Sequence, residues 1–123
     1  YRANGVEMDM EIALFNADHD QNLKETVALA RKAYANRPGI HAADALAWAL
    51  YKTGQYEEAQ KYSEEALQLG TQDALKLFHA GMIAHALHND QEARQYLEQA
   101  LSINPHFSIL FAEQAQELLQ SLE

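Results

Sequence analysis

An internal repeat limits the fold of this chain more than any other feature. The unit spans Ala43 to Gly70, and one constant shift along the sequence places related side chains on one another over its whole length. The aligned pairs are Ala47 with Gly81, Ala59 with Ala93, Tyr62 with Tyr96, Ala66 with Ala100, Leu67 with Leu101 and Leu69 with Ile103. A more divergent copy precedes the unit, with Ile12 on Leu46 and, after a change of register by one residue, Ala33 on Ala66. Three copies of one unit predict a stack of similar elements in which each copy packs on its neighbours.

Each copy is expected to form two helices joined by a short turn. Apolar residues recur at spacings of three and four, which is typical of a helix with one buried face. Gly54, Gly70 and Pro105 mark ends of helices, and Thr71 is expected to cap the fifth helix at its N-terminus. The expected helices cover residues 7–16, 23–35, 40–52, 56–69, 72–88, 92–103 and 106–122.

Small residues recur where the two helices of each copy are expected to cross. They are Ala13, Ala47 and Gly81 on the first helix, and Ala59 and Ala93 on the second. Antiparallel helices approach to roughly 8–10 Å, and small side chains at the crossing permit the closer distances. The pattern therefore predicts closely packed helical hairpins.

The repeat resembles the tetratricopeptide repeat, whose period is about 34 residues. The resemblance extends over about Val6 to Pro105, and the matching positions are Leu46 with Ala47, Ala80 with Gly81, the alanines Ala59 and Ala93, and the closing prolines Pro38 and Pro105. The tryptophan and phenylalanine positions of the family pattern hold other residues here, namely Ala43, Leu77, Ser63 and Leu97. The resemblance implies an all-α fold, a right-handed α-solenoid of three hairpins plus a C-terminal capping helix. We expect one domain over residues 1–123, with repeats at about 6–38, 40–71 and 74–105 and the capping helix at 106–122.

The first five residues suggest that the repeats continue upstream. Tyr1-Arg2-Ala3 followed by Asn4-Gly5 resembles the last turn of a helix closed by a glycine. We therefore expect the chain to be the C-terminal part of a longer repeat protein.

In this family the first helix of each repeat lines a concave groove that holds a segment of a partner protein. The resemblance places a partner-binding groove on Met10, Leu14, His41, Asp44, Trp48, Tyr51, Phe78, His79, Met82 and His85. Trp48, Phe78 and Met82 are expected to grip apolar side chains of the partner. The alternative is that Trp48 and Met82 pack against neighbouring helices. Members that bind chaperone tails use lysine, asparagine and arginine in these positions, which this chain lacks, so we expect a different kind of partner.

The charge of the chain limits the class of that partner. The formal net charge is −9 at pH 7, so nucleic acids and anionic membranes would be repelled. A neutral or basic protein or peptide fits better. The sequence contains no cysteine, and no apolar run approaches the roughly 18 residues of a membrane span. The compartment is not determined by the sequence, and the cytoplasm is the default expectation.

The sequence favours a scaffold over an enzyme. His85 and His88 lie three residues apart on one expected helix, but a zinc site would need further ligands, and we expect neither a metal nor a cofactor. No nucleophile motif, metalloprotease motif or phosphate-binding glycine loop is present. We expect a non-catalytic protein-interaction scaffold. The alternative is a structural segment that completes a longer array or forms a homodimer through its C-terminal helix.

Overall fold

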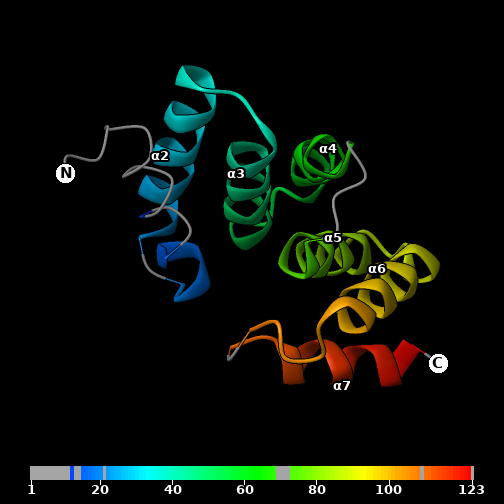
Figure 1. The fold of residues 1–123 in the computed structure, drawn as a ribbon. Helices are drawn as coiled ribbons and strands as arrows, with labels where there is room; N and C mark the ends of the chain where they lie inside the picture. The colour runs from blue at the N-terminus through cyan, green and yellow to red at the C-terminus, as the bar shows by residue number, and fades with distance from the viewer. Residues whose placement is uncertain (1–11, 13–14, 21, 69–72, 109, 123) are drawn as a thin grey trace. The chain divides into compact units, whose positions relative to one another are not determined.

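The computed structural model describes residues 12, 15–20, 22–68, 73–108 and 110–122 (Figure 1). The helices with defined bounds are α2 (Leu23–Asn36), α3 (Ile40–Lys52), α4 (Tyr56–Leu67), α5 (Ala74–Ala86), α6 (Asp90–Ile103) and α7 (Ala112–Leu122). The described residues contain no strand, so the predicted all-α helical-repeat fold is confirmed. The helices fall into two compact units, unit 1 (Tyr1–Ala66) and unit 2 (Leu67–Glu123). The expected single domain and its repeat boundaries stay a prediction.

In unit 1, α2 packs against both helices of the next hairpin. It contacts α3 and is joined to α4 by polar side chains. The guanidinium of Arg31 donates two hydrogen bonds to the Glu58 carboxylate, at 2.9 and 2.8 Å, and thereby lowers the pKa of Glu58. The Tyr34 hydroxyl donates to Glu65 Oε1 at 2.7 Å. Because the Arg31–Glu58 pair is exposed, we regard it as setting the register of the helices more than their stability.

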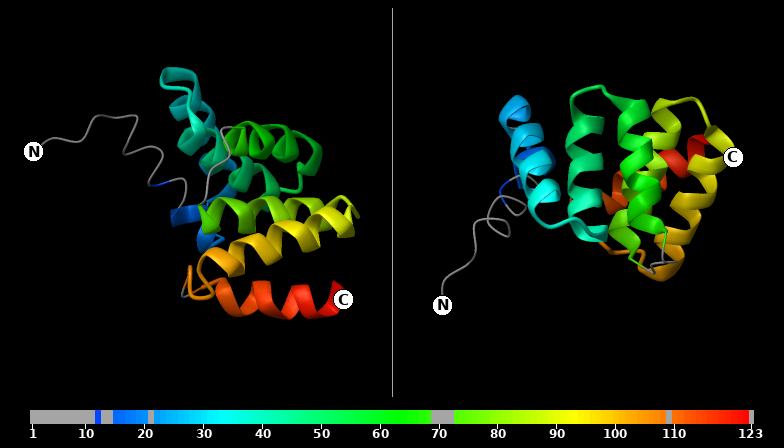
Figure 2. Two further views of the ribbon diagram at one scale, coloured as in Figure 1. Left: turned by 45° about the vertical axis from the view of Figure 1, so that its right-hand side comes forward. Right: turned by 90° about the horizontal axis from the view of Figure 1, so that it is seen from above.

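In unit 2, α5, α6 and α7 form an up-down-up arrangement in which α6 packs on both of the other helices (Figure 2). Gly81 of α5 lies against Leu97 of α6 so closely that a Cβ atom on Gly81 would be 2.9 Å from Leu97 Cγ and Cδ2. Ala93 is fully buried on α6, as Ala47 and Ala59 are in unit 1. Four of the small residues predicted for the helix crossings therefore lie in the interior of their units, and the fifth, Ala13, lies outside the described residues.

The N-terminus of α5 is capped by Asp73, whereas the sequence pattern favoured Thr71. Asp73 Oδ1 accepts hydrogen bonds from the backbone N–H groups of Leu75 and Lys76, and Oδ2 accepts one from Lys76 Nζ at 2.9 Å. Burial alone would raise the pKa of the Asp73 carboxyl, but these hydrogen bonds outweigh it and lower the pKa. Thr71 itself lies outside the described residues. The cap matters because Lys76 is buried and its ammonium needs this carboxylate.

Helix α7 begins six residues later than the expected start at residue 106. The Ser108 hydroxyl accepts hydrogen bonds from the backbone N–H groups of Leu110 and Phe111, at 3.1 and 3.2 Å, as an N-terminal serine does. Pro105 to Ser108 therefore form a turn and not the first turn of the helix. The C-terminal end of α5 is also shorter than expected, at Ala86.

The turns within the two hairpins have the same geometry at aligned positions. Gly54 has φ 82°, and His88, its counterpart in the next copy, has φ 65°. The next residue in each turn donates a backbone hydrogen bond of 2.9 Å to the equivalent helix carbonyl, Gln55 to Leu50 and Asn89 to Ala84. Glycine adopts this left-handed conformation without strain, but histidine does not.

We therefore expect His88→Gly to stabilise unit 2. Relief of the left-handed strain is worth about 1–2 kcal/mol, of which the greater freedom of glycine in the unfolded chain removes about 0.5–1 kcal/mol. Urea unfolding followed by circular dichroism should show a net gain of about 0.5–1 kcal/mol in the free energy of unfolding. The matched control is Gly54→His, which should lose a similar amount. A loss of stability in His88→Gly would contradict the shared turn geometry.

Candidate functional site

The residues predicted to line the groove differ widely in accessibility. Met10 and Leu14 lie outside the described residues. His41 is exposed, and Tyr51 and His85 are half-buried. The other five are buried, and they are Asp44, Trp48, Phe78, His79 and Met82. Fewer residues of the first helices are therefore accessible to a partner than the sequence predicted.

Trp48 lies in the interior of unit 1. Its side chain is 1% exposed, and its indole N–H donates a hydrogen bond of 2.9 Å to Asp18 Oδ1. The Tyr51 ring stacks parallel to the indole at 4.8 Å, with an interplanar angle of 5°. Lys52 Nζ lies 5.1 Å from the centroid of the Trp48 ring. These contacts favour the alternative in which Trp48 packs against its neighbours, and they leave Tyr51 as the outer ring of the stack.

Around Tyr51 the structure assembles a mixed aromatic and charged edge, formed by Tyr51, Tyr56, Asp20 and Lys52. The rings of Tyr51 and Tyr56 are 5.7 Å apart, and Lys52 Nζ pairs with Asp20 Oδ1 at 3.1 Å. Burial raises the pKa of the Tyr51 hydroxyl, and Tyr56 and Asp20 raise it further. Tyr51 therefore stays protonated at neutral pH and can both donate and accept a hydrogen bond. We call these four residues the Tyr51 edge.

Sequence reasoning found Tyr51 but missed the other members of the Tyr51 edge. Asp20 has a left-handed backbone, with φ 54°, in the turn where the first copy changes register by one residue. That irregularity in the repeat was the available signal, because an inserted residue marks a turn with its own conformation. Nothing in the periodicity indicated that Asp18 would accept the indole hydrogen bond.

In unit 2 the predicted groove residues other than His85 form part of the core. Phe78 is fully buried, and its ring contacts those of Phe107 at 5.3 Å and Phe111 at 5.0 Å. His79 is also fully buried, and Met82 is 6% exposed. At the C-terminal end of α5, His85 Nδ1 lies 3.2 Å from Asp90 Oδ1. Phe78 thus anchors the segment that leads into α7.

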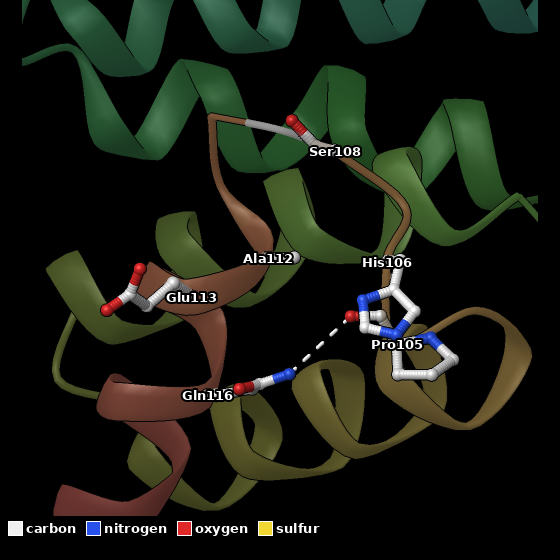
Figure 3. Close-up of a pocket in the computed structure, with 6 residues that line it drawn as sticks. All are labelled: Pro105, His106, Ser108, Ala112, Glu113 and Gln116. Carbon is white, nitrogen blue, oxygen red and sulfur yellow. Dashed lines mark hydrogen bonds between the residues drawn. The ribbon is translucent and has the colours of Figure 1, made fainter.

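That same segment borders an open hollow of about 490 Å³ (Figure 3). The hollow lies between the turn after α6 and the first two turns of α7. Its lining residues are Pro105, His106, Ser108, Ala112, Glu113 and Gln116. Gln116 Nε2 points to the Pro105 carbonyl oxygen at 3.5 Å. The sequence did not indicate this hollow, because it exists only where α7 starts after residue 108.

The described part of the chain shows no group of three or more histidine, aspartate or glutamate side chains placed to hold a metal ion. His85 pairs with Asp90, whereas His88 occupies the left-handed turn position. None of the helices that the structure describes combines the length and the apolar character that a membrane crossing requires.

Comparison with known families agrees with this geometry. Two family models, both described as tetratricopeptide repeat, match residues 40–80 and 74–107, which contain α3 to α6. A search of the curated proteins gave no match. Tetratricopeptide repeats generally mediate protein–protein interaction and are typically non-catalytic. The chain belongs to the tetratricopeptide repeat family.

Proposed function

We propose that this protein is a non-catalytic scaffold that holds a segment of a partner protein on the accessible side of its first helices. The contacts come from the Tyr51 edge together with His41, all in unit 1, and His85 of unit 2 is proposed as a separate contact. The buried Trp48 supports the Tyr51 edge from inside and does not touch the partner.

The accessibility of Tyr51 beside a buried Trp48 is the observation that carries this proposal. The indole is held by Asp18 and stacks on one face of the tyrosine ring, so the ring is fixed before a partner arrives. A fixed aromatic side chain loses little conformational entropy on binding, which is why tyrosine is common among residues that dominate binding energy. Tyr56 extends the aromatic surface, being 37% exposed.

Charge sets the kind of partner. The formal net charge of −9 disfavours acidic segments and speeds association with basic ones. A segment with apolar and basic side chains would place the former on Tyr51 and Tyr56 and the latter near Asp20. We therefore expect a neutral or basic protein partner.

The test is capture of partners from a lysate of the source cells by the tagged protein and by Tyr51→Ala. We expect at least one captured protein to be lost, or reduced about tenfold or more, with Tyr51→Ala, because truncation of an aromatic anchor costs about 2 kcal/mol. Tyr96→Ala, a half-buried tyrosine on α6, is the matched control and should retain that protein.

Two outcomes would contradict the proposal. Every captured protein could survive Tyr51→Ala, His41→Ala and His85→Ala, which would place binding on another surface. Recovery of untagged copies of the chain alone would instead support the alternative in which the protein completes an array or forms a homodimer through α7.

A further inference from the structure

The ion pair within the Tyr51 edge is asymmetric, because one member is much more accessible than the other. Lys52 Nζ lies 3.1 Å from Asp20 Oδ1, and the side chain of Lys52 is 17% exposed whereas that of Asp20 is 65% exposed. His19, the neighbour of Asp20 in the turn, lies against the Phe15 ring, with 4.4 Å between the ring centroids. A partner would therefore meet an Asp20 carboxylate that is already paired with an ammonium group of the protein itself.

A second contact holds the Lys52 ammonium in this position. Nζ lies 5.1 Å from the centroid of the Trp48 ring, a distance at which the face of an indole attracts a cation. Trp48 is itself fixed by its hydrogen bond to Asp18. Because the lysine is already held on the ring, pairing with Asp20 costs it little further side-chain entropy. Lys52 is therefore well placed to compete for Asp20 with a basic group that a partner brings.

We propose that Lys52 is an internal competitor that limits how strongly the Tyr51 edge binds basic side chains. The inference rests on the proposed scaffold function and names the residue that sets the charge selectivity of the same surface. A basic side chain that approaches Asp20 must share the carboxylate with Lys52, against the repulsion of two like charges, or displace the ammonium. A neutral side chain meets neither cost. The tyrosine rings then supply most of the affinity, and a basic residue adds little.

Lys52 also has a local role, because it lies in the last turn of α3, where the helix dipole favours a cation. That role predicts a loss of stability when the charge is removed, but no change in the ligands that the surface prefers. The two roles are distinguished by the ratio of the affinities for a charged ligand and for an uncharged ligand of the same shape. We call this ratio the charge preference.

The test is a titration of the ¹⁵N-labelled protein with acetyl-Leu-Arg-Leu-amide and with acetyl-Leu-citrulline-Leu-amide, followed by the amide chemical shifts of residues 51–56. Citrulline has nearly the shape of arginine but no charge. In the unmodified protein we expect a charge preference of about twofold or less. Lys52→Met keeps an unbranched apolar stem beside the indole and should raise the preference by about twofold to fivefold, the usual worth of one exposed ion pair. Lys52→Gln, which also removes the charge, should show the same rise.

Three further variants are controls. Lys52→Arg keeps the charge, so its charge preference should match that of the unmodified protein. Asp20→Asn removes the carboxylate, so it should abolish the rise when it is combined with Lys52→Met. Lys61→Met changes the net charge by the same amount as Lys52→Met. Lys61 Nζ also lies near an aromatic ring, 5.5 Å from the centroid of Tyr62, but on α4 and outside the Tyr51 edge, so its variant should keep the original preference.

An unchanged charge preference in Lys52→Met and Lys52→Gln, an equal rise in Lys61→Met, or a rise that survives Asp20→Asn would overturn the role of Lys52. The absence of shifts at residues 51–56 with both peptides in every variant would overturn it as well. Circular dichroism of each variant ensures that folded proteins are compared.

Failure of this inference is separable from failure of the scaffold function. Partner capture that depends on Tyr51, together with an unchanged charge preference, contradicts the role of Lys52 alone. A raised preference in Lys52→Met without any capture that depends on Tyr51 contradicts the scaffold function and leaves Lys52 as the competitor for Asp20.

Discussion

Replacement of Trp48 by alanine should destabilise unit 1 by about 3–5 kcal/mol, the usual cost of removing a large buried aromatic side chain. The indole is 1% exposed and stacked on Tyr51, so its removal leaves a cavity that its neighbours cannot fill. It also removes the donor to Asp18. Because Trp48 is the single tryptophan of the chain, urea unfolding of the variant must be followed by circular dichroism.

Two milder substitutions separate the parts of this effect. Trp48→Phe keeps much of the ring but loses the indole hydrogen bond, and it should cost about 1–2 kcal/mol. Asp18→Asn keeps an acceptor at Oδ1 and should cost less than Trp48→Phe. If Trp48→Ala were as stable as the unmodified protein, the side chain would lie in an open groove and the account of unit 1 given above would be wrong.

Replacement of Gly81 by valine should destabilise unit 2 by about 3 kcal/mol. A Cβ atom there would lie 2.9 Å from Leu97 Cγ and Cδ2 and 3.4 Å from the Ala93 carbonyl oxygen. Leu97 is fully buried, so the helices must move apart or the leucine must leave its rotamer, and overpacking of this kind typically costs about 1–3 kcal/mol or more. Gly81→Ala should cost less, because alanine favours a helix by about 1 kcal/mol over glycine.

The cause of the Gly81→Val effect can be tested with Leu97→Ala. That substitution alone should cost about 2–5 kcal/mol. Combined with Gly81→Val it should cost about 1–2 kcal/mol less than the sum of the two, since the valine occupies part of the space that the leucine leaves. The free energies of unfolding from urea denaturation give the coupling. Simple additivity would show that the two side chains do not compete for the same volume.

The repeat made the hairpins predictable, because close crossing demands small residues at positions that alignment reveals. Alignment of the copies placed Ala47 on Gly81 and Ala59 on Ala93, and the structure buries all four. The bounds of α3, Ile40–Lys52, also follow from sequence, since glycine residues lie just beyond each end. The helix crossings and the bounds of α3 were predictable because both depend on residues close together in the sequence.

The accessibility of Trp48 could not be predicted, because α3 has no single apolar face. Residues 42–50 are all buried, so the pattern along the helix does not indicate which side meets solvent. Asp44 is buried among them, although a carboxylate would suggest an exposed position. The deciding contact comes from Asp18, 30 residues away, and no spacing rule predicts a hydrogen bond over that distance.

The hollow was hidden from sequence for a different reason. Apolar residues from Phe107 onward have helical spacing, which favoured a helix from residue 106. Instead, the Ser108 hydroxyl accepts hydrogen bonds from backbone N–H groups at the start of the helix. A serine can form such a cap or lie within a longer helix, and the packing of its neighbours decides between the two. Here Phe107 and Phe111 both contact Phe78, which fixes the turn between them.

Photo-crosslinking from position 51 tests the central claim most directly. Tyr51 would be replaced by p-benzoylphenylalanine in the full chain, expressed in the source cells and irradiated, with Tyr96 replaced in the same way as a control. The account predicts a crosslinked partner protein from position 51 that is absent or much weaker from position 96. Crosslinks from position 96 alone, or none from position 51 in cells where the partner is otherwise captured, would contradict a partner surface at Tyr51.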